Sequence, residues 1–245
     1  MKTAVITGAS GGIGSAIAQR LAADGFSVVA GYNHSVERAE SLVAQLPGRG
    51  HRAMRIALLE PESLADLAHT LAESPGSLDV LVNCAGVTRP VPHDDLDRLD
   101  DSTIDEIFAT NWRGSFAAIR SLRPLLDKAD GAVVVNISSV SAVTGQGSNV
   151  AYCASKAALD SMTRSLARAL APLVRVVSVS PGWVVGEYAD QMPPEVLDAQ
   201  REATPLERLA TPDDVARAVS AVVNDLPFTT GAIVSVDGGR PLGVA

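Results

Sequence analysis

The sequence predicts one α/β domain built around a doubly wound parallel sheet with helices on both faces. Short β-branched runs alternate with longer amphipathic stretches rich in alanine and leucine, the pattern of βαβ units. The β-branched runs are apolar almost throughout, as strands covered on both faces must be. A chain of 245 residues without an internal repeat, low-complexity tract or linker fits a single domain spanning 1–245.

Seven strands and six helices are expected in alternation along the chain. The two longest irregular stretches, 88–101 and 186–209, follow the fourth and sixth strands, on the side where open α/β sheets bind ligands. The predicted strands are 3–7, 26–31, 51–57, 78–83, 132–138, 174–180 and 232–238, and the predicted helices lie near 13–24, 35–46, 61–73, 103–126, 152–170 and 212–225.

Composition argues against several classes of protein. The chain has 28 acidic and 20 basic residues and a net charge of -8, which disfavours nucleic acid and anionic membranes as partners. No apolar run approaches the roughly 18 residues of a membrane span, and the start of the chain does not resemble a signal peptide, so a cytoplasmic protein is expected. Cys84, Cys153 and four scattered histidines show no metal-ligand spacing, so no metal site is predicted.

A glycine-rich turn, TGASGGIG at 7–14, separates the first strand from the first helix. Gly8, Gly12 and Gly14 would allow positive φ, close approach of a ligand to bare backbone and tight packing of helix on strand. The helix start would then offer free N–H groups to a pyrophosphate. A simple tight turn would also explain the motif taken alone. The nucleotide interpretation adds Ser10 and Ile13 as contacts within the turn.

The end of the second strand bears on which nucleotide is preferred. An acidic residue there would hydrogen-bond a ribose 2′-hydroxyl, whereas donors without an acid admit a 2′-phosphate. The stretch GYNHSVER, 31–38, has no acid before Glu37. Asn33, His34 and Ser35, with Arg38 nearby, favour NADP(H), and NAD(H) stays the other option. A solvated loop leading into a helix capped by Ser35 is compatible with the same residues.

Tyr152 and Lys156 stand four apart in YCASK, so both polar tips lie on one face of a predicted helix. A free tyrosine has a pKa of about 10, and a neighbouring ammonium is the simplest way to favour its anion. The chain has three lysines, and this one sits among Ala154, Ala157 and Leu159 rather than in a polar surface stretch. A chance pairing on a helix would explain the spacing if it stood alone.

Six short motifs, taken together, resemble the short-chain dehydrogenase/reductase family in order and spacing: TGASGGIG, NCAG at 83–86, NWRG at 111–114, SS at 138–139, YCASK at 152–156 and PG at 181–182. The resemblance covers essentially the whole chain and implies a Rossmann-like fold. It also implies Tyr152 as general acid/base, Lys156 as the group that lowers its pKa and holds the nicotinamide ribose, Ser139 as the hydroxyl that orients a carbonyl, and Asn111 as anchor of a proton-relay water.

The resemblance further implies nucleotide contacts beyond the glycine turn. These are Leu58 after the third strand, Asn83, Ala85 and Gly86 after the fourth, and Pro181, Gly182 and Val184 after the sixth. Three positions depart from the family pattern. Cys84 replaces a second asparagine, Gly186 stands where a threonine is usual, and Leu58 lies where many relatives carry an aspartate. These departures concern nucleotide affinity and preference more than the type of reaction.

The implied activity is hydride transfer between NADP(H) and a small-molecule carbonyl or secondary alcohol, as a ketone or 3-oxoacyl reductase. The 186–209 stretch would be the substrate lid, with Trp183 at its base and Tyr188, Met192 and Leu197 as apolar contacts. Few cations mark 127–131 and 171–175, so an acidic carrier protein is no better supported than a free ketone. A nucleotide-sensing protein without catalytic activity, on the same fold, is the alternative; dehalogenation without a nucleotide is disfavoured by the glycine turn.

The family also implies a homotetramer, or a dimer, paired through helices 103–126 and 152–170 and the C-terminal strand, with weak support from the apolar tail 241–245.

Overall fold

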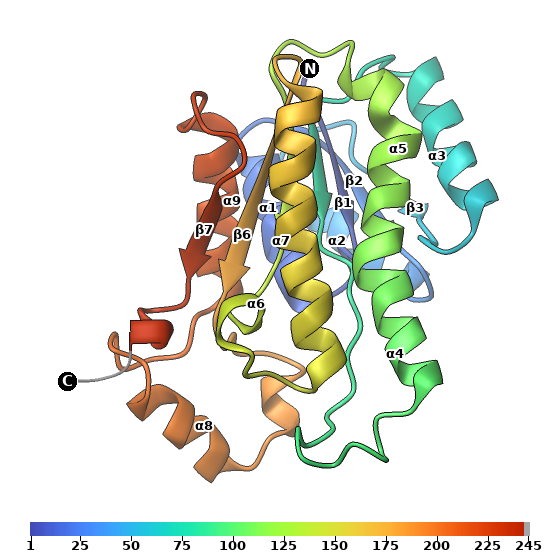
Figure 1. The fold of residues 1–245 in the computed structure, drawn as a ribbon. Coiled ribbons are helices and arrows are strands. Elements are labelled where there is room, and N and C mark those ends of the chain that lie inside the picture. Colours follow the sequence, from blue (N-terminus) through green and yellow to red (C-terminus); the bar gives the residue numbers. More distant parts are fainter. Residues whose placement is uncertain (243–245) are drawn as a thin grey trace.

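All seven predicted strands form, and they join one parallel sheet in a computed structural model that describes residues 1–242 (Figure 1). The strand order is β3-β2-β1-β4-β5-β6-β7, so the order of connection reverses between β1 and β4. That reversal opens a crevice at the carboxyl ends of the strands, where open α/β sheets bind ligands. The strands are β1 Thr3–Thr7, β2 Ser27–Tyr32, β3 Arg52–Arg55, β4 Val80–Asn83, β5 Ala132–Ile137, β6 Val174–Pro181 and β7 Ile233–Val236.

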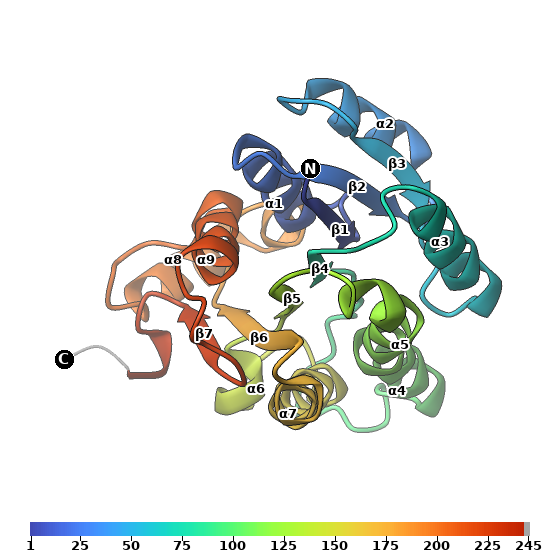
Figure 2. The same ribbon diagram turned by 90° about the horizontal axis from the view of Figure 1, so that it is seen from above.

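Helices cover both faces of the sheet, which confirms the doubly wound, Rossmann-like prediction (Figure 2). One apolar core joins the sheet to α1 (Gly12–Ala23), α2 (Val36–Gln45) and α9 (Pro212–Asn224) through buried residues such as Ile17, Leu42 and Val219. The other core joins the opposite face to α3 (Pro61–Glu73), α5 (Ser115–Leu126) and α7 (Val150–Leu170), with Leu67 and Leu122 fully buried. Alternate residues of the five central strands enter the two cores, since side chains along a strand point to opposite faces.

The predicted helix 103–126 is one continuous helical run that changes pitch in its middle. It comprises α4 (Asp101–Phe108), a π-helical segment, Ala109–Gly114, and α5. Asn111 lies inside the π segment, and its carbonyl accepts a hydrogen bond from the Ser115 hydroxyl at 2.9 Å. Single π turns inside α-helices are frequent at functional sites. Asn111, a residue type with low helix propensity, therefore lies in a local widening of the helix and not at a break.

Several short elements were not predicted from the sequence. They are α6 (Ser141–Thr144), α8 (Pro194–Glu202) and two 3₁₀ turns, Ala189–Gln191 and Arg240–Leu242. The predicted lid therefore contains a helix of its own, α8, which buries none of its residues. The tail 241–245 falls mostly outside the described residues. Across residues 1–242, no helix is both long and apolar enough to span a bilayer.

Candidate active site

The glycine turn brings the head of α1 against the turn that follows β4. Gly8 has φ +68°, and a Cβ at this position would lie 2.9 Å from the Cα of Ala85. A Cβ on Gly14 would lie 2.3 Å from the carbonyl oxygen of Gly8, whereas one on Gly12 would meet only open space. Both close approaches need glycine. The open side at Gly12 leaves room for a ligand against the first turn of α1.

Thr7 fixes the relative position of these two turns, a role that sequence reasoning did not assign to it. Its hydroxyl oxygen accepts from the backbone N–H groups of Cys84 and Ala85 at 3.0 and 3.1 Å. The start of the glycine motif and the turn after β4 therefore form one unit. The signal was present in the sequence, because Thr7 ends the first strand immediately before Gly8.

A cavity of about 360 Å³ separates the glycine turn from α2. Arg38 lines it together with Ser10, and the Arg38 guanidinium pairs with Glu187 of the lid at 2.6 Å. Sequence reasoning named Arg38 as a nearby donor but did not predict Glu187 as its partner. The full lining is Ala9, Ser10, Ser15, Glu37, Arg38, Ser41, Leu42 and Gln45.

The residues predicted at the end of β2 lie at the entrance to α2. Asn33 and His34 are exposed, and the Asn33 amide nitrogen lies 2.9 Å from Nε2 of His34. Ser35 occupies the N-cap of α2 as expected, yet its side chain makes no capping hydrogen bond. None of these three side chains therefore hydrogen-bonds to the backbone of α2.

Two predicted nucleotide contacts turn their side chains into the core. The Asn83 amide donates to Oδ1 of Asn136 at 2.9 Å, so it ties β4 to β5 inside the sheet. Leu58 is 8% exposed and packs against the π segment, because a Cβ on Gly114 would lie 2.8 Å from the Leu58 Cβ. Any nucleotide contact made by these two positions must therefore involve the backbone, and both stay predictions.

Asn111 holds the loop after β4 through its side-chain amide. Its Oδ1 accepts from the backbone N–H of Val87 at 2.8 Å, and its Nδ2 donates to the Val87 carbonyl at 3.1 Å and to the Ser155 hydroxyl at 3.0 Å. A Cβ on Gly86 would lie 3.2 Å from Asn111 Oδ1 and 3.6 Å from Lys156 Nζ. The structure thus places Asn111, Gly86 and Lys156 around one point.

Ser139 and Tyr152 meet where β5 ends and α7 begins. The Ser139 hydroxyl accepts from the backbone N–H of Ser141 and donates to the Ser141 hydroxyl, both at 3.1 Å. The Tyr152 phenol lies near enough to Ser139 for this hydroxyl to act on its pKa. Burial raises the pKa of Tyr152 to about 12, and the neighbouring Ser139 hydroxyl acts in the opposite direction. A protonated phenol next to a hydroxyl is a pair of donors suited to a carbonyl oxygen.

Lys156 is buried one turn further along α7 and has an unusual environment for an ammonium. Its Nζ donates to the Ile137 carbonyl at 2.8 Å and lies 5.7 Å from the centre of the Tyr152 ring. Burial lowers the pKa of Lys156 to about 8. The ammonium does not contact the phenol oxygen here, so the expected lowering of the Tyr152 pKa by Lys156 stays a prediction.

Two buried residues beside this cluster were missed by sequence reasoning. Asn149 caps α7 by accepting from the Tyr152 N–H at 2.7 Å, and its Nδ2 donates to the Arg89 carbonyl at 2.7 Å. Asp160 lies one turn beyond Lys156, and burial raises the pKa of its carboxyl group. Both had a signal in the sequence, namely a capping residue type before a helix for Asn149 and a four-residue spacing from Lys156 for Asp160.

The turn after β6 closes the site from the other side. Pro181 accepts from the Val140 N–H at 2.8 Å, which links this turn to the one that carries Ser139. A Cβ on Gly182 would lie 3.0 Å from the Asp237 Cα, and Val184 pairs with Ala210 in an isolated bridge. The lid therefore begins from a fixed base beside the predicted catalytic residues.

A glycine turn at the head of the first helix, with serine, tyrosine and lysine gathered where β5 ends and α7 begins, is the arrangement expected of an oxidoreductase that uses a nucleotide. A family model described as enoyl-(acyl carrier protein) reductase matches residues 8–240. The chain belongs to the short-chain dehydrogenase/reductase family, as the sequence motifs predicted.

Relatives of full length differ in the reactions that their names describe. A 3-oxoacyl-acyl-carrier-protein reductase of Staphylococcus aureus is 32% identical over 97% of both chains. A cis-4-hydroxycyclohexanecarboxylate dehydrogenase of Sinomonas cyclohexanicum is 36% identical over 97% of this chain and 96% of its own. A short-chain dehydrogenase/reductase structure from Brucella melitensis superimposes with a TM-score of 0.91 at 29% identity, covering 98% of this chain and 96% of that one.

Proposed function

We propose that this protein is an NADP(H)-dependent reductase that transfers hydride to the carbonyl carbon of a small ketone or 3-oxoacyl thioester. The observation that carries the proposal is the proximity of the Ser139 hydroxyl to the Tyr152 phenol at the carboxyl end of β5. A carbonyl oxygen placed between the two hydroxyl groups would accept from both. Negative charge that develops on that oxygen would then meet two fixed donors.

The glycine turn fits a dinucleotide. The close approaches at Gly8 and Gly14, the open space at Gly12 and the start of α1 suit a pyrophosphate held by backbone N–H groups. Ser10 and Ile13 lie in the same turn, and Ala85 borders it. The bound nucleotide would supply the hydride, and the chain's residues would bind, orient and protonate.

Tyr152 would deliver the proton that completes reduction. Because its pKa is raised to about 12, the phenol is protonated at neutral pH and ready to act as the acid. The reverse reaction needs the phenolate, so alcohol oxidation should become faster as the pH rises. Lys156, which is charged below about pH 8, would hold the nicotinamide ribose and favour the phenolate. Asn111 would position a water near Lys156, and Pro181, Gly182 and Val184 would face the nicotinamide.

NADP(H) is favoured over NAD(H) by charge at the adenosine end. No carboxylate stands between the end of β2 and Glu37, and Arg38 borders the cavity next to the glycine turn, which Glu37 also lines. A guanidinium can bind a phosphate with two parallel hydrogen bonds. Asn33, His34 and Ser35 are placed to add weaker donors.

The substrate class rests on the relatives and on the lid. The names of two relatives describe a 3-oxoacyl thioester and a cyclic secondary alcohol as substrates. Trp183 and Tyr188, whose ring centres are 6.0 Å apart, give the lid an aromatic base that suits either an acyl chain or a ring. The interconversion of a carbonyl group and a secondary alcohol is the shared chemistry.

We also propose that the protein forms a homotetramer. Its proposed location is the cytoplasm, which rests on the sequence composition. Trp112 stacks on Phe116 with ring centres 6.1 Å apart, and the Arg120 guanidinium lies 5.8 Å from the centre of the Phe116 ring. Trp112 is 36% exposed. An aromatic pair on the outer side of the 103–126 run suits pairing with a second copy.

The proposed activity is tested by following NADPH and NADH oxidation at 340 nm with 3-oxoacyl thioesters, cyclic ketones, diketones and sugars. Turnover that is faster with NADPH and lost in Tyr152→Phe supports the proposal. Tight nucleotide binding without turnover on any compound would instead favour a nucleotide-sensing protein.

A further inference from the structure

The Arg38–Glu187 ion pair joins two parts of the molecule that belong to opposite halves of the sheet. Arg38 lies in the first turn of α2, after β2, and Glu187 lies in the lid, after β6. In the strand order, β2 and β6 are four spacings apart, which is about 19 Å at roughly 4.8 Å per spacing. The pair therefore bridges the crevice between β1 and β4 rather than joining neighbours.

One partner of this bridge is the cation that the proposed function assigns to the nucleotide. Arg38 lines the cavity beside Ser10 and Ser15 of the glycine turn and the start of α1. Its guanidinium donors are shared with the Glu187 carboxylate at 2.6 Å. A 2′-phosphate entering the same cavity would compete for those donors, and the Glu187 charge would repel the incoming dianion.

We propose that Glu187 is a specificity-determining residue, which weakens binding of the 2′-phosphate by occupying Arg38 and is released from Arg38 when a 2′-phosphorylated nucleotide binds. This inference rests on the proposed nucleotide binding and adds a link to the lid. Because binding free energies are reciprocal, a phosphate that displaces Glu187 also frees the lid from α2. NAD(H), which lacks the phosphate, leaves the ion pair in place.

The size of the expected change in NADPH affinity follows from the solvent exposure of the Arg38–Glu187 ion pair. The Arg38 and Glu187 side chains are 51% and 67% exposed, so the attraction between them is screened by water and salt. An exposed ion pair of this kind changes an equilibrium by up to about fivefold. The effect must fade at an ionic strength near 1 M, where the screening length falls to about 3 Å.

The first experiment measures NADPH and NADH dissociation constants by titration calorimetry for wild type, Glu187→Gln, Arg38→Ala and the double variant. Glu195→Gln, which removes an exposed carboxylate from the first turn of α8, is the matched control. Glu187→Gln should tighten NADPH binding about two- to fivefold and leave NADH unchanged. Arg38→Ala should weaken NADPH binding and abolish the effect of Glu187→Gln, and the control should match wild type.

The outcomes separate this inference from the proposed function. Equal changes for NADPH and NADH in Glu187→Gln, or no change for either, would overturn the role of Glu187 while leaving nucleotide binding intact. Binding of neither nucleotide to wild type would overturn the proposed function, and this inference with it.

A second experiment reports on the lid directly through the fluorescence of Trp183, which lies 6.0 Å from Tyr188 between ring centres. In a Trp112→Phe background, adenosine 2′,5′-bisphosphate should change the emission of Trp183, whereas 5′-AMP should not. The change should disappear in Arg38→Ala. The same response to both compounds would contradict release of the lid by the 2′-phosphate.

Discussion

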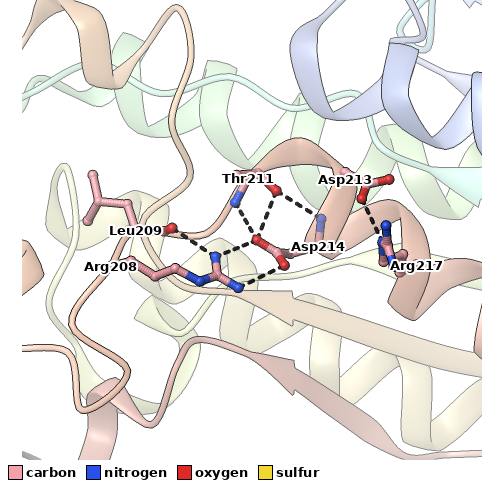
Figure 3. A network of polar contacts seen from close by, with 6 residues as sticks. All are labelled: Arg208, Leu209, Thr211, Asp213, Asp214 and Arg217. Carbon is pink, nitrogen blue, oxygen red and sulfur yellow. Dashed lines mark hydrogen bonds and ion pairs between the residues drawn. The ribbon is translucent and has the colours of Figure 1, made fainter.

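The starts of α7 and α9 are both capped by side chains, but the two caps are built differently. At α9, Thr211 and Asp214 form a reciprocal capping box, and Arg208 donates to the Asp214 carboxylate at 2.7 and 3.0 Å (Figure 3). At α7, Asn149 accepts one N–H from Tyr152 and donates to the carbonyl of Arg89, sixty residues away along the chain.

We interpret the α9 start as support for the fold and the α7 start as support for the proposed catalytic residue Tyr152. The α9 network lies close to the surface, closes within seven residues and anchors the end of the lid, where Arg208 also donates to the Leu209 carbonyl at 3.1 Å. The Asn149 cap is buried, with 1% exposure, and it links Tyr152 to the loop after β4. A buried and fully bonded polar group makes its surroundings rigid, so Asn149 can hold Tyr152 in place, whereas the local, exposed contacts at α9 mainly add stability.

Replacing Tyr152 with phenylalanine should have the largest effect on activity of any change at the α7 start. Loss of the proton donor is expected to lower kcat by about 100- to 10,000-fold, while the melting temperature and the NADPH dissociation constant stay close to wild type. Steady-state kinetics measures kcat, and thermal denaturation of the same preparation measures the melting temperature. Residual turnover above a tenth of wild type would show that another group donates the proton.

Lys156→Met should lower activity without lowering stability, whereas loss of a helix cap lowers stability. Activity should fall by about 100-fold or more, and stability should stay unchanged or rise by up to about 3 kcal/mol, because a buried ammonium is costly. Its pKa is lowered from 10.5 to about 8, so the wild-type penalty is full below pH 8 and diminishes as the pH rises toward 10.5. Urea denaturation at pH 7 and pH 10 should show the advantage of the variant shrinking.

Asn149→Ala should lower both stability and activity, because the Asn149 side chain caps α7 and positions Tyr152. We expect a loss of about 1–2 kcal/mol in the free energy of unfolding and about tenfold in kcat. Asn149→Ser can still cap α7 but cannot reach the Arg89 carbonyl. It should therefore recover stability more than turnover. Equal recovery of both would mean that Asn149 is a cap and nothing more.

Changes at the start of α9 should have the smallest effect on catalysis. Thr211→Ala should cost about 1 kcal/mol of stability and leave kcat within twofold of wild type. Arg208 holds the pKa of Asp214 well below its usual range, so the contribution of that carboxylate is complete above about pH 4 and is lost only in stronger acid. The stability difference between wild type and Asp214→Asn should be constant from pH 5 to 7 and shrink below pH 4.

Much of the fold could be predicted because its signals are local. The buried strands are apolar runs, and the glycine turn and the Tyr152–Lys156 spacing place the site at the carboxyl end of the sheet. The helix α8 was missed because its sequence, PEVLDAQRE, has too few apolar residues to show a periodic face, in keeping with its lack of buried residues. The Arg38–Glu187 bridge was missed for a different reason. Contacts between residues this far apart in the chain depend on how the sheet is assembled.

The most direct test of the proposed function is a single turnover with NADPH deuterated at the 4-position of the nicotinamide ring, followed by mass spectrometry of the product. The account predicts one deuterium on the carbinol carbon, from one of the two stereoisomers of the labelled nucleotide, with wild type but not with Tyr152→Phe. Consumption of substrate without deuterium in the product, or no alcohol from any compound of the panel, would contradict hydride transfer at this site.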